Sequence, residues 1–218
     1  MSDAPHDTSP ADDSPAEGLH PDLDADLGPG LPPPPASWPK RGSRRGVDLR
    51  LFQARHDLLQ NPRTGAELER LVLECPDWVN VVALTPEREL VVVTQYRFGV
   101  EAVTLEIPGG MVDPGEEHGV AARRELAEET GYTAESWRYL GSVEPNPAVQ
   151  NNRLHTWLAE GARPTAAQAL DPGEDIAVGT LPMEEVGRAV RDGRIAHSLV
   201  LCALLHVLDL SDPALRGL

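Results

Sequence analysis

Three glutamates, Glu125, Glu128 and Glu129, crowd one flank of a predicted helix in the stretch IPGGMVDPGEEHGVAARRELAEETGY, residues 107–132. Glu128 and Glu129 follow Glu125 at spacings of three and four residues, so the three carboxylates project from the same side of the helix. Like charges at this spacing repel each other, and the C-terminal end of a helix also disfavours anions. The crowding therefore requires a compensating charge.

Arg124 is the nearest candidate for that charge, but it stands at helical spacing only from Glu128. Glu125 has Ala121 and Glu129 as its neighbours at a spacing of four residues, so a solvated face held by salt bridges fits the pattern poorly. A divalent cation would relieve the repulsion, and carboxylate oxygens suit Mg²⁺ or Mn²⁺. The cluster predicts a metal site on this helix.

The residues around the cluster resemble the Nudix box, G-x5-E-x7-R-E-U-x-E-E-x-G-U. Chance agreement of the invariant letters in a chain of this length has odds of about one in a million. The matching positions are Gly110, Glu116, Arg124, Glu125, Leu126, Glu128, Glu129 and Gly131. The one departure is Tyr132, which occupies a packing position where the family usually has an aliphatic residue. The resemblance implies an α+β fold, the family's α/β/α sandwich with a mixed sheet, in which a loop-helix-loop forms the catalytic platform.

The resemblance also implies roles for the residues of the box. Glu125 and Glu129 would be the main metal ligands, Glu128 would share the metal or assist, and the carbonyl oxygen of Gly109 would complete the coordination. Arg124 would orient the glutamates. The family's chemistry is attack by water on phosphorus in a nucleoside diphosphate linked to another moiety. A metal cluster held by carboxylates can activate that water and neutralise charge on the diphosphate.

The flanks of the box resemble one branch of the family, the pyrophosphatases of ADP-ribose and nucleoside diphosphate sugars. The stretches are QYRFGVEAVTLEIPGG before the box, and PNPAVQNNRLHTWLAEG and DPGEDIAV after it, with Pro147 sixteen residues after Gly131. The likeness covers residues 47–208. It implies a Mg²⁺-dependent enzyme, with Mn²⁺ as the alternative metal, that yields a nucleoside monophosphate and a sugar phosphate. It also implies a homodimer in which N-terminal strands cross to the partner.

Glu174, in the stretch PGEDI, matches a loop glutamate with which this branch positions or deprotonates the attacking water. An ionised carboxylate can accept a proton from a water that a metal has acidified. Asp175 is its close rival, and a solvated loop acid without a catalytic role is the alternative for both.

Three residues near the end of the preceding strand are candidates for substrate binding. Arg97 has a guanidinium suited to phosphate oxygens, although an exposed arginine at a strand end is the alternative. Tyr96, like Trp78, could stack on a base, although aromatic residues in strands more often belong to the core. Glu106 resembles a position that the branch uses near its substrate, with a solvent-facing strand acid as the alternative.

Two other functions stay open. The box does not separate a sugar-nucleotide hydrolase from an enzyme for dinucleoside polyphosphates or damaged nucleoside triphosphates. A non-catalytic domain that senses a nucleotide is disfavoured, because every glutamate of the box is intact and no helix-turn-helix is visible. A panel of substrates discriminates among these functions.

Charge divides the 218 residues into a tail and a domain. The formal net charge is −16, and residues 1–39 contain eight Asp or Glu and no Lys or Arg. We predict a disordered acidic, Pro-rich tail over residues 1–37, followed by a Nudix domain over residues 38–212 that includes dimerisation strands. The acidic balance argues against nucleic-acid and membrane partners, which are anionic themselves. The lack of a signal segment and of a long apolar run predicts a cytoplasmic protein.

The order of the expected elements is typical of a layered α+β fold: strands, a helix, strands and two helices. The helix that bears the glutamates is expected over residues 117–130, ended by Gly131. The two C-terminal helices are expected at residues 182–192 and 197–208. Strands are expected near residues 48–55, 68–73, 78–85, 90–96, 101–107, 137–143 and 153–159.

Overall fold

A computed structural model describes residues 35–208 of the chain. The predicted tail falls almost wholly outside this range, and residues 35–37 are exposed and form no helix or strand. Residues 209–212, the predicted end of the domain, also lie outside it. Among the residues described, no helix is long and apolar enough to cross a membrane.

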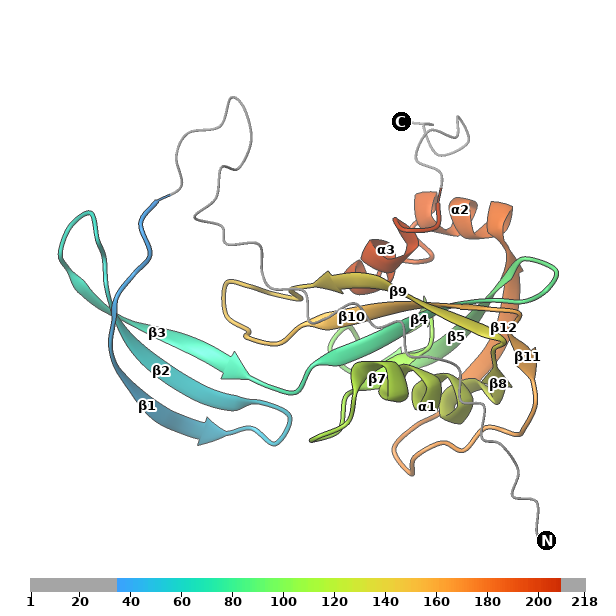
Figure 1. Cartoon of the computed structure of the whole chain (residues 1–218), viewed down its shortest axis with the longest axis horizontal. Helices are drawn as coiled ribbons and strands as arrows, with labels where there is room; N and C mark the ends of the chain where they lie inside the picture. Colours follow the sequence, from blue (N-terminus) through green and yellow to red (C-terminus); the bar gives the residue numbers. More distant parts are fainter. Residues whose placement is uncertain (1–34, 209–218) are drawn as a thin grey trace, which may run out of the picture.

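A seven-stranded mixed sheet forms the centre of the molecule, with the order β12-β5-β4-β10-β9 (Figure 1). Two short strands complete it, β6 beside β5 and β7 beside β4, and only the pair β4 and β10 is parallel. The strands are β4 (Trp78–Leu84), β5 (Glu89–Arg97), β6 (Ala102–Glu106), β7 (Gly109–Met111), β9 (Ser136–Val143), β10 (Leu154–Glu160) and β12 (Ile176–Pro182). A separate small pair joins β8 (Tyr132–Thr133) to β11 (Arg163–Pro164).

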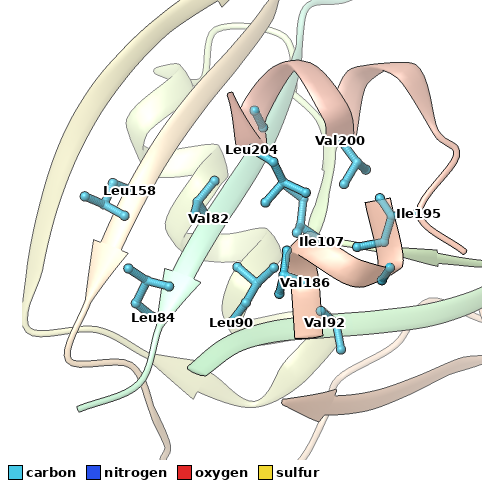
Figure 2. Packing of buried hydrophobic residues seen from close by; sticks show 12 residues of the cluster. Val82, Leu84, Leu90, Val92, Ile107, Leu158, Val186, Ile195, Val200 and Leu204 are labelled. Carbon is cyan, nitrogen blue, oxygen red and sulfur yellow. The ribbon is translucent and has the colours of Figure 1, made fainter. Parts of the chain in front are cut away.

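Helices cover both faces of this sheet, α1 (His118–Thr130) on one side and α2 (Met183–Arg191) with α3 (Ser198–Leu204) on the other (Figure 1). The central strand β4 is apolar almost throughout because successive side chains point to opposite faces and both faces are covered. Val81 packs in the cluster under α1, whereas Val82 and Leu84 pack with Leu204 in the cluster under α2 and α3 (Figure 2). The predicted α+β sandwich is confirmed.

A three-stranded antiparallel sheet precedes the sandwich and stands apart from it (Figure 1). Its strands are β1 (Lys40–Asp48), β2 (Gln53–Gln60) and β3 (Glu67–Glu74). The expected strand at residues 48–55 is wrong, because the chain turns there: Leu49 N–H donates to Phe52 O over 2.8 Å, and Arg50 has a positive φ of 68°. The apolar letters of LRLF resemble a strand, but they form the hairpin turn that joins β1 to β2.

The helices begin and end close to the expected residues, with one exception. Gly131 ends α1 in the left-handed conformation, with φ of 72°, and its N–H donates to Ala127 O over 2.8 Å. This is the conformation that glycine adopts without strain. The last helix is shorter than expected, because α3 ends at Leu204 and residues 205–207 form turns, with His206 N–H bonding to Ala203 O at a spacing of three.

Candidate active site

Two glycines before the helix, Gly109 and Gly110, let β7 lie directly against β4 and α1. A Cβ on Gly110 would overlap with the Glu125 carboxylate, and a Cβ on Gly109 would overlap with the backbone carbonyl of Val79. The N–H of Gly109 donates to Oε2 of Glu129 over 2.9 Å. Close approach to the backbone of β4 therefore requires glycine at position 109, whereas a side chain at position 110 would displace the Glu125 carboxylate.

Arg124 holds three glutamates of the box side by side. Its Nε and Nη2 donate to the two carboxylate oxygens of Glu116 over 3.0 and 2.9 Å, while Nη1 donates to Glu125 over 2.8 Å and to Glu128 over 3.1 Å. Nη2 also donates to the carbonyl of Met111 over 2.9 Å. These partners raise the pKa of Arg124, with the bond to Glu116 as the largest cause. The contacts are those that an orienting role for Arg124 requires.

Glu129 is a buried carboxylate that forms no ion pair with any of residues 35–208. Burial raises its pKa to about 8, repulsion from Glu125 and Glu174 adds to the shift, and the N–H of Gly109 and the more distant Arg97 oppose it. Burial also raises the pKa of Glu125, and repulsion from Glu128 and Glu174 keeps it raised although Arg124 is bonded to this carboxylate. Within residues 35–208, therefore, no ion pair offsets the cost of ionising Glu129, and a cation bound beside it would favour the ionised form.

This donor set fits a divalent cation. Glu125 and Glu129 are buried, the side chain of Glu128 is 43 % exposed, and carboxylate oxygens are the ligands that Mg²⁺ and Mn²⁺ prefer. Across residues 35–208, no three acidic, His or Cys side chains converge into a preassembled metal site. In this structure Arg124 holds Glu125 and Glu128, while Glu129 bonds to Gly109. The ligand assignments, including the carbonyl of Gly109, stay predictions.

Glu174 comes to this cluster from the loop between β11 and β12. Its charge raises the pKa of both Glu125 and Glu129, so the loop lies within electrostatic range of them. Its carboxylate accepts a hydrogen bond from the N–H of Asp171 over 2.9 Å. Asp175 is also exposed on this loop. The structure thus brings Glu174 to the metal-site candidates, and its catalytic role stays a prediction.

Arg97 and Glu106 form a two-pronged ion pair, with Nε–Oε1 at 2.8 Å and Nη2–Oε2 at 2.7 Å. The hydroxyl of Thr104 also donates to Glu106 over 2.6 Å. Glu106 is 3 % exposed, so the alternative of a solvent-facing acid is wrong. Burial acts to raise the pKa of Glu106, but Arg97 and Thr104 outweigh it and the pKa is lowered. The pair fixes the guanidinium plane of Arg97 beside the glutamate cluster.

The aromatic candidates differ in burial. Tyr96 is 49 % exposed and lies edge-on to Phe98, with ring centroids 5.6 Å apart, so the core alternative is wrong for Tyr96. Trp78 is half-buried at the start of β4, where it pairs with Met111 and Leu154. The ring of Tyr96 is the more accessible of the two.

Sequence reasoning missed two residues that support the site, Thr104 and Gln168, and assigned no role to a third, Glu116. Glu116 is one of the residues of the box, but its hydrogen bond with Arg124 joins the loop to the helix, and no periodicity of the sequence predicts it. Thr104 is an ordinary strand residue, although its spacing of two from Glu106 places both side chains on the same face of β6. Gln168 donates to the backbone of α1 from a loop that no motif covers.

The comparisons with known proteins agree with this geometry. Residues 76–203 match the family model of the NUDIX domain. A methanol dehydrogenase activator of Bacillus methanolicus is 33% identical over 144 residues, covering 66% of this chain and 78% of the relative. The ADP-ribose pyrophosphatase of Bacillus subtilis is 31% identical over 151 residues, covering 66% of this chain and 82% of the relative. That of Mycobacterium tuberculosis is 30% identical over 159 residues, covering 72% of this chain and 76% of the relative.

A solved structure, the crystal structure of an ADP compounds hydrolase, has the same fold. It superposes with a TM-score of 0.71 at 21% sequence identity and covers 80% of this chain and 94% of that one. The family model itself covers more than half of this chain. The chain therefore belongs to the Nudix family, in the branch that contains the ADP-ribose pyrophosphatases.

Proposed function

We propose that this Nudix pyrophosphohydrolase cleaves the diphosphate linkage of ADP-ribose or a related nucleoside diphosphate sugar, giving a nucleoside monophosphate and a sugar phosphate. The observation that carries the proposal is the pair of buried carboxylates Glu125 and Glu129, of which only Glu125 is bonded to Arg124, with Glu174 in electrostatic range. The two ADP-ribose pyrophosphatases among the relatives support the choice of substrate class. A cytoplasmic location, where sugar nucleotides are dissolved, is part of the same proposal.

Nudix hydrolases use divalent metal ions, and we propose Mg²⁺ here, with Mn²⁺ as the alternative. Glu125 and Glu129 would be its main ligands, with Glu128 and the carbonyl of Gly109 completing the set. When bound, the metal supplies acidity to a water molecule and positive charge beside the diphosphate. Arg124 keeps the carboxylates of Glu125 and Glu128 side by side, because it donates a hydrogen bond to each of them.

Glu174 is the proposed base of the reaction. Its carboxylate accepts a proton from water as the water oxygen bonds to phosphorus and the bridging P–O bond breaks. The exposed loop allows this carboxylate to exchange its bond to Asp171 for one to water. Asp175 is the alternative base, and a comparison of Glu174→Gln with Asp175→Asn distinguishes the two.

Arg97 and Tyr96 are the proposed substrate contacts. Glu106 already holds the guanidinium of Arg97, so less side-chain freedom is lost when a phosphate oxygen binds to it. The exposed ring of Tyr96 offers a face on which a base can stack. These residues suit an anionic nucleotide, in keeping with a small-molecule partner rather than a nucleic acid or a membrane.

We further propose a homodimer formed through the N-terminal sheet. Leu58 and Leu71 share one face of the sheet formed by β2 and β3. Leu71 lies opposite His56, and His56 is two residues from Leu58 on β2, so all three side chains point to the same side. Both leucines are exposed, as are Val47, Leu49 and Leu51. Light scattering should show a dimer, and the variant Leu58→Arg with Leu71→Arg should be monomeric. A wild-type monomer that retains full activity would contradict the proposal.

A substrate panel with Mg²⁺ tests the proposed function. ADP-ribose, other nucleoside diphosphate sugars, dinucleoside polyphosphates and nucleoside triphosphates are compared by phosphate released after a phosphatase step. We expect the highest kcat/KM for a nucleoside diphosphate sugar, with AMP and ribose 5-phosphate as the products from ADP-ribose. Preference for a dinucleoside polyphosphate or a nucleoside triphosphate would show that the enzyme has another Nudix specificity. No turnover of any substrate would favour a nucleotide sensor.

A further inference from the structure

The loop that carries Glu174 also caps the helix that carries the glutamate cluster. The N–H groups of Thr165 and Ala166 donate to the carbonyl of Gly131 over 2.9 and 3.1 Å, and the N–H of Ala169 donates to Glu128 O over 2.8 Å. A helix leaves its last carbonyls unpaired, and α1 has no basic residue in its last turn to satisfy them. The first half of the loop supplies the missing donors.

Gln168 adds a bond of a different kind, because its side chain joins two elements. Its Nε2 donates to the carbonyl of Glu129 over 2.6 Å and to the carbonyl of Ile176 over 3.0 Å. The first acceptor lies in the last turn of α1, and the second opens β12, two residues after Glu174. One amide group, which has two hydrogens to donate, therefore closes the loop onto the helix end.

The segment between Ala169 and Ile176 has few other constraints. The hydrogen bonds that it makes within residues 35–208 join Asp171 to Glu174, so they are internal to one turn. Nearly all of its residues are exposed. The bonds of Gln168 and Ala169 at one end and the strand β12 at the other therefore determine where Glu174 lies.

We propose that Gln168 is a positioning residue, whose amide sets the place of Glu174 relative to Glu125 and Glu129. The proposal rests on the proposed role of Glu174 as the base. An amide is needed at this position, because both acceptors are carbonyl oxygens and only a donor can join them. A glutamate at position 168 would present oxygen to two carbonyls close to the carboxylate cluster, and an asparagine would be shorter by one carbon.

Steady-state kinetics of Gln168→Ala with ADP-ribose and Mg²⁺ give the first test. We expect kcat to fall by about 10- to 100-fold, the effect of a small misplacement of a catalytic group. KM should change less than kcat, because the two hydrogen bonds of Gln168 go to α1 and β12 and not to Arg97 or Tyr96. Gln168→Glu should be at least as impaired as Gln168→Ala.

A double-mutant cycle separates positioning from a general structural effect. If Gln168 acts through Glu174, the variant Gln168→Ala with Glu174→Gln should have the kcat of Glu174→Gln alone. Losses that multiply would overturn the proposal. Gln60→Ala is the matched control, since Gln60 also donates an amide hydrogen to a backbone carbonyl, that of Gly65 over 3.1 Å, in the N-terminal sheet.

Hydrogen exchange gives a readout that does not depend on activity. The amides of Thr165, Ala166 and Ala169, which bond to the end of α1, should exchange about tenfold faster in Gln168→Ala, as the loop opens more often, and should be unchanged in Gln60→Ala. Unchanged exchange in Gln168→Ala would overturn the proposal. If the wild-type chain hydrolysed no substrate of the panel, the proposed function would fail, and hydrogen exchange would still decide whether Gln168 fixes the loop.

Discussion

Two buried carboxylates, Asp57 in the N-terminal sheet and Glu129 in α1, are equally inaccessible, since each residue is 3 % exposed. Asp57 accepts hydrogen bonds from Ser43 over 2.6 Å and Arg55 over 3.0 Å, and it pairs with Lys40 over 2.8 Å. Burial alone would raise its pKa, but these partners lower it far below the usual range. Glu129 has one backbone N–H as its partner, no ion pair within residues 35–208, and a raised pKa.

The difference separates a structural charge from a functional one. A buried charge that its own chain satisfies is neutral or favourable, whereas an unpaired buried charge destabilises the fold. A costly, unpaired carboxylate next to others of the same sign is typical of a functional site. Asp57 therefore serves the fold of the N-terminal sheet, whereas the environment of Glu129 is the one expected of the proposed metal ligand.

The largest expected effect comes from Glu129→Gln, which removes the unpaired charge and keeps the shape. Turnover should fall by about 10³-fold, or ~4 kcal/mol of barrier, because a neutral amide is a poor metal ligand. The apparent melting temperature should not fall, since a repulsive charge is lost. Mg²⁺ should stabilise the wild type but not the variant in thermal scans. Near-normal activity in Mg²⁺ would refute the metal assignment, and Glu117→Gln, at the start of the same helix, is the control.

Arg124 pairs with some acids of the site and not with others: it bonds to Glu116, Glu125 and Glu128 but does not reach Glu129. Arg124→Lys should lower kcat by about 10- to 100-fold, since an ammonium group cannot bridge Glu116, Glu125 and Glu128 in one plane. Kinetics and Mg²⁺ titration measure the loss. The neighbouring Arg123, which lies over the ring of Trp137, provides the control Arg123→Lys, for which we expect less than about a twofold change. Equal effects would contradict the bridging role.

Asp57→Asn removes the negative charge that pairs with Lys40 and Arg55. It should lower the stability of the fold and leave turnover unchanged. Lys40 and Arg55 would lose their common partner, and we expect a loss of about 2 kcal/mol, below the usual value for a fully buried pair because both cations reach solvent. The melting temperature should fall by roughly 4–8 °C. Glu67→Gln, an exposed acid on β3, is the control, and unchanged stability of Asp57→Asn would show that the network is incidental.

Acid should reproduce the effect of Asp57→Asn. The pKa of Asp57 is depressed in the folded protein, so its stabilisation is complete above its unfolded pKa of about 3.9 and is lost as pH falls towards the folded value. Chemical denaturation of wild type and Asp57→Asn from pH 7 down to pH 3 should therefore show a difference in stability that is constant at higher pH and begins to shrink below about pH 4. A constant difference across this range would contradict the linkage.

The smallest effect is expected from the charges of residues 1–34, to which we assign no chemistry. Their deletion should leave melting temperature and kcat nearly unchanged. At low salt KM should fall slightly, because the substrate is anionic, and this effect should fade at physiological ionic strength, where the Debye length is about 8 Å. A salt-independent loss of about tenfold or more in turnover would show that the tail contributes to the site.

The sequence predicted the parts of the site that depend on local periodicity. The shared flank of Glu125, Glu128 and Glu129 follows from 3.6 residues per turn, and Gly131 ends the helix as expected. Most strands of the sandwich also follow from their apolar runs, but β7 and β12 were not expected from the sequence. The hairpin turn at residues 49–52 was mispredicted, because apolar letters in a turn resemble those in a strand.

Contacts between distant segments could not be predicted in this way. The bond of Gln168 to the end of α1 spans 39 residues, and the pairing of Arg97 with Glu106 depends on how β6 lies on β5. Whether a buried carboxylate is satisfied is also a property of the tertiary structure, since Asp57 and Glu129 have the same acidic group in the sequence. The spacing of the glutamates by itself determined that negative charge would accumulate on one helix. Only the packing decided which of these charges the chain neutralises, because neutralisation requires cations and N–H donors from other elements within hydrogen-bond distance.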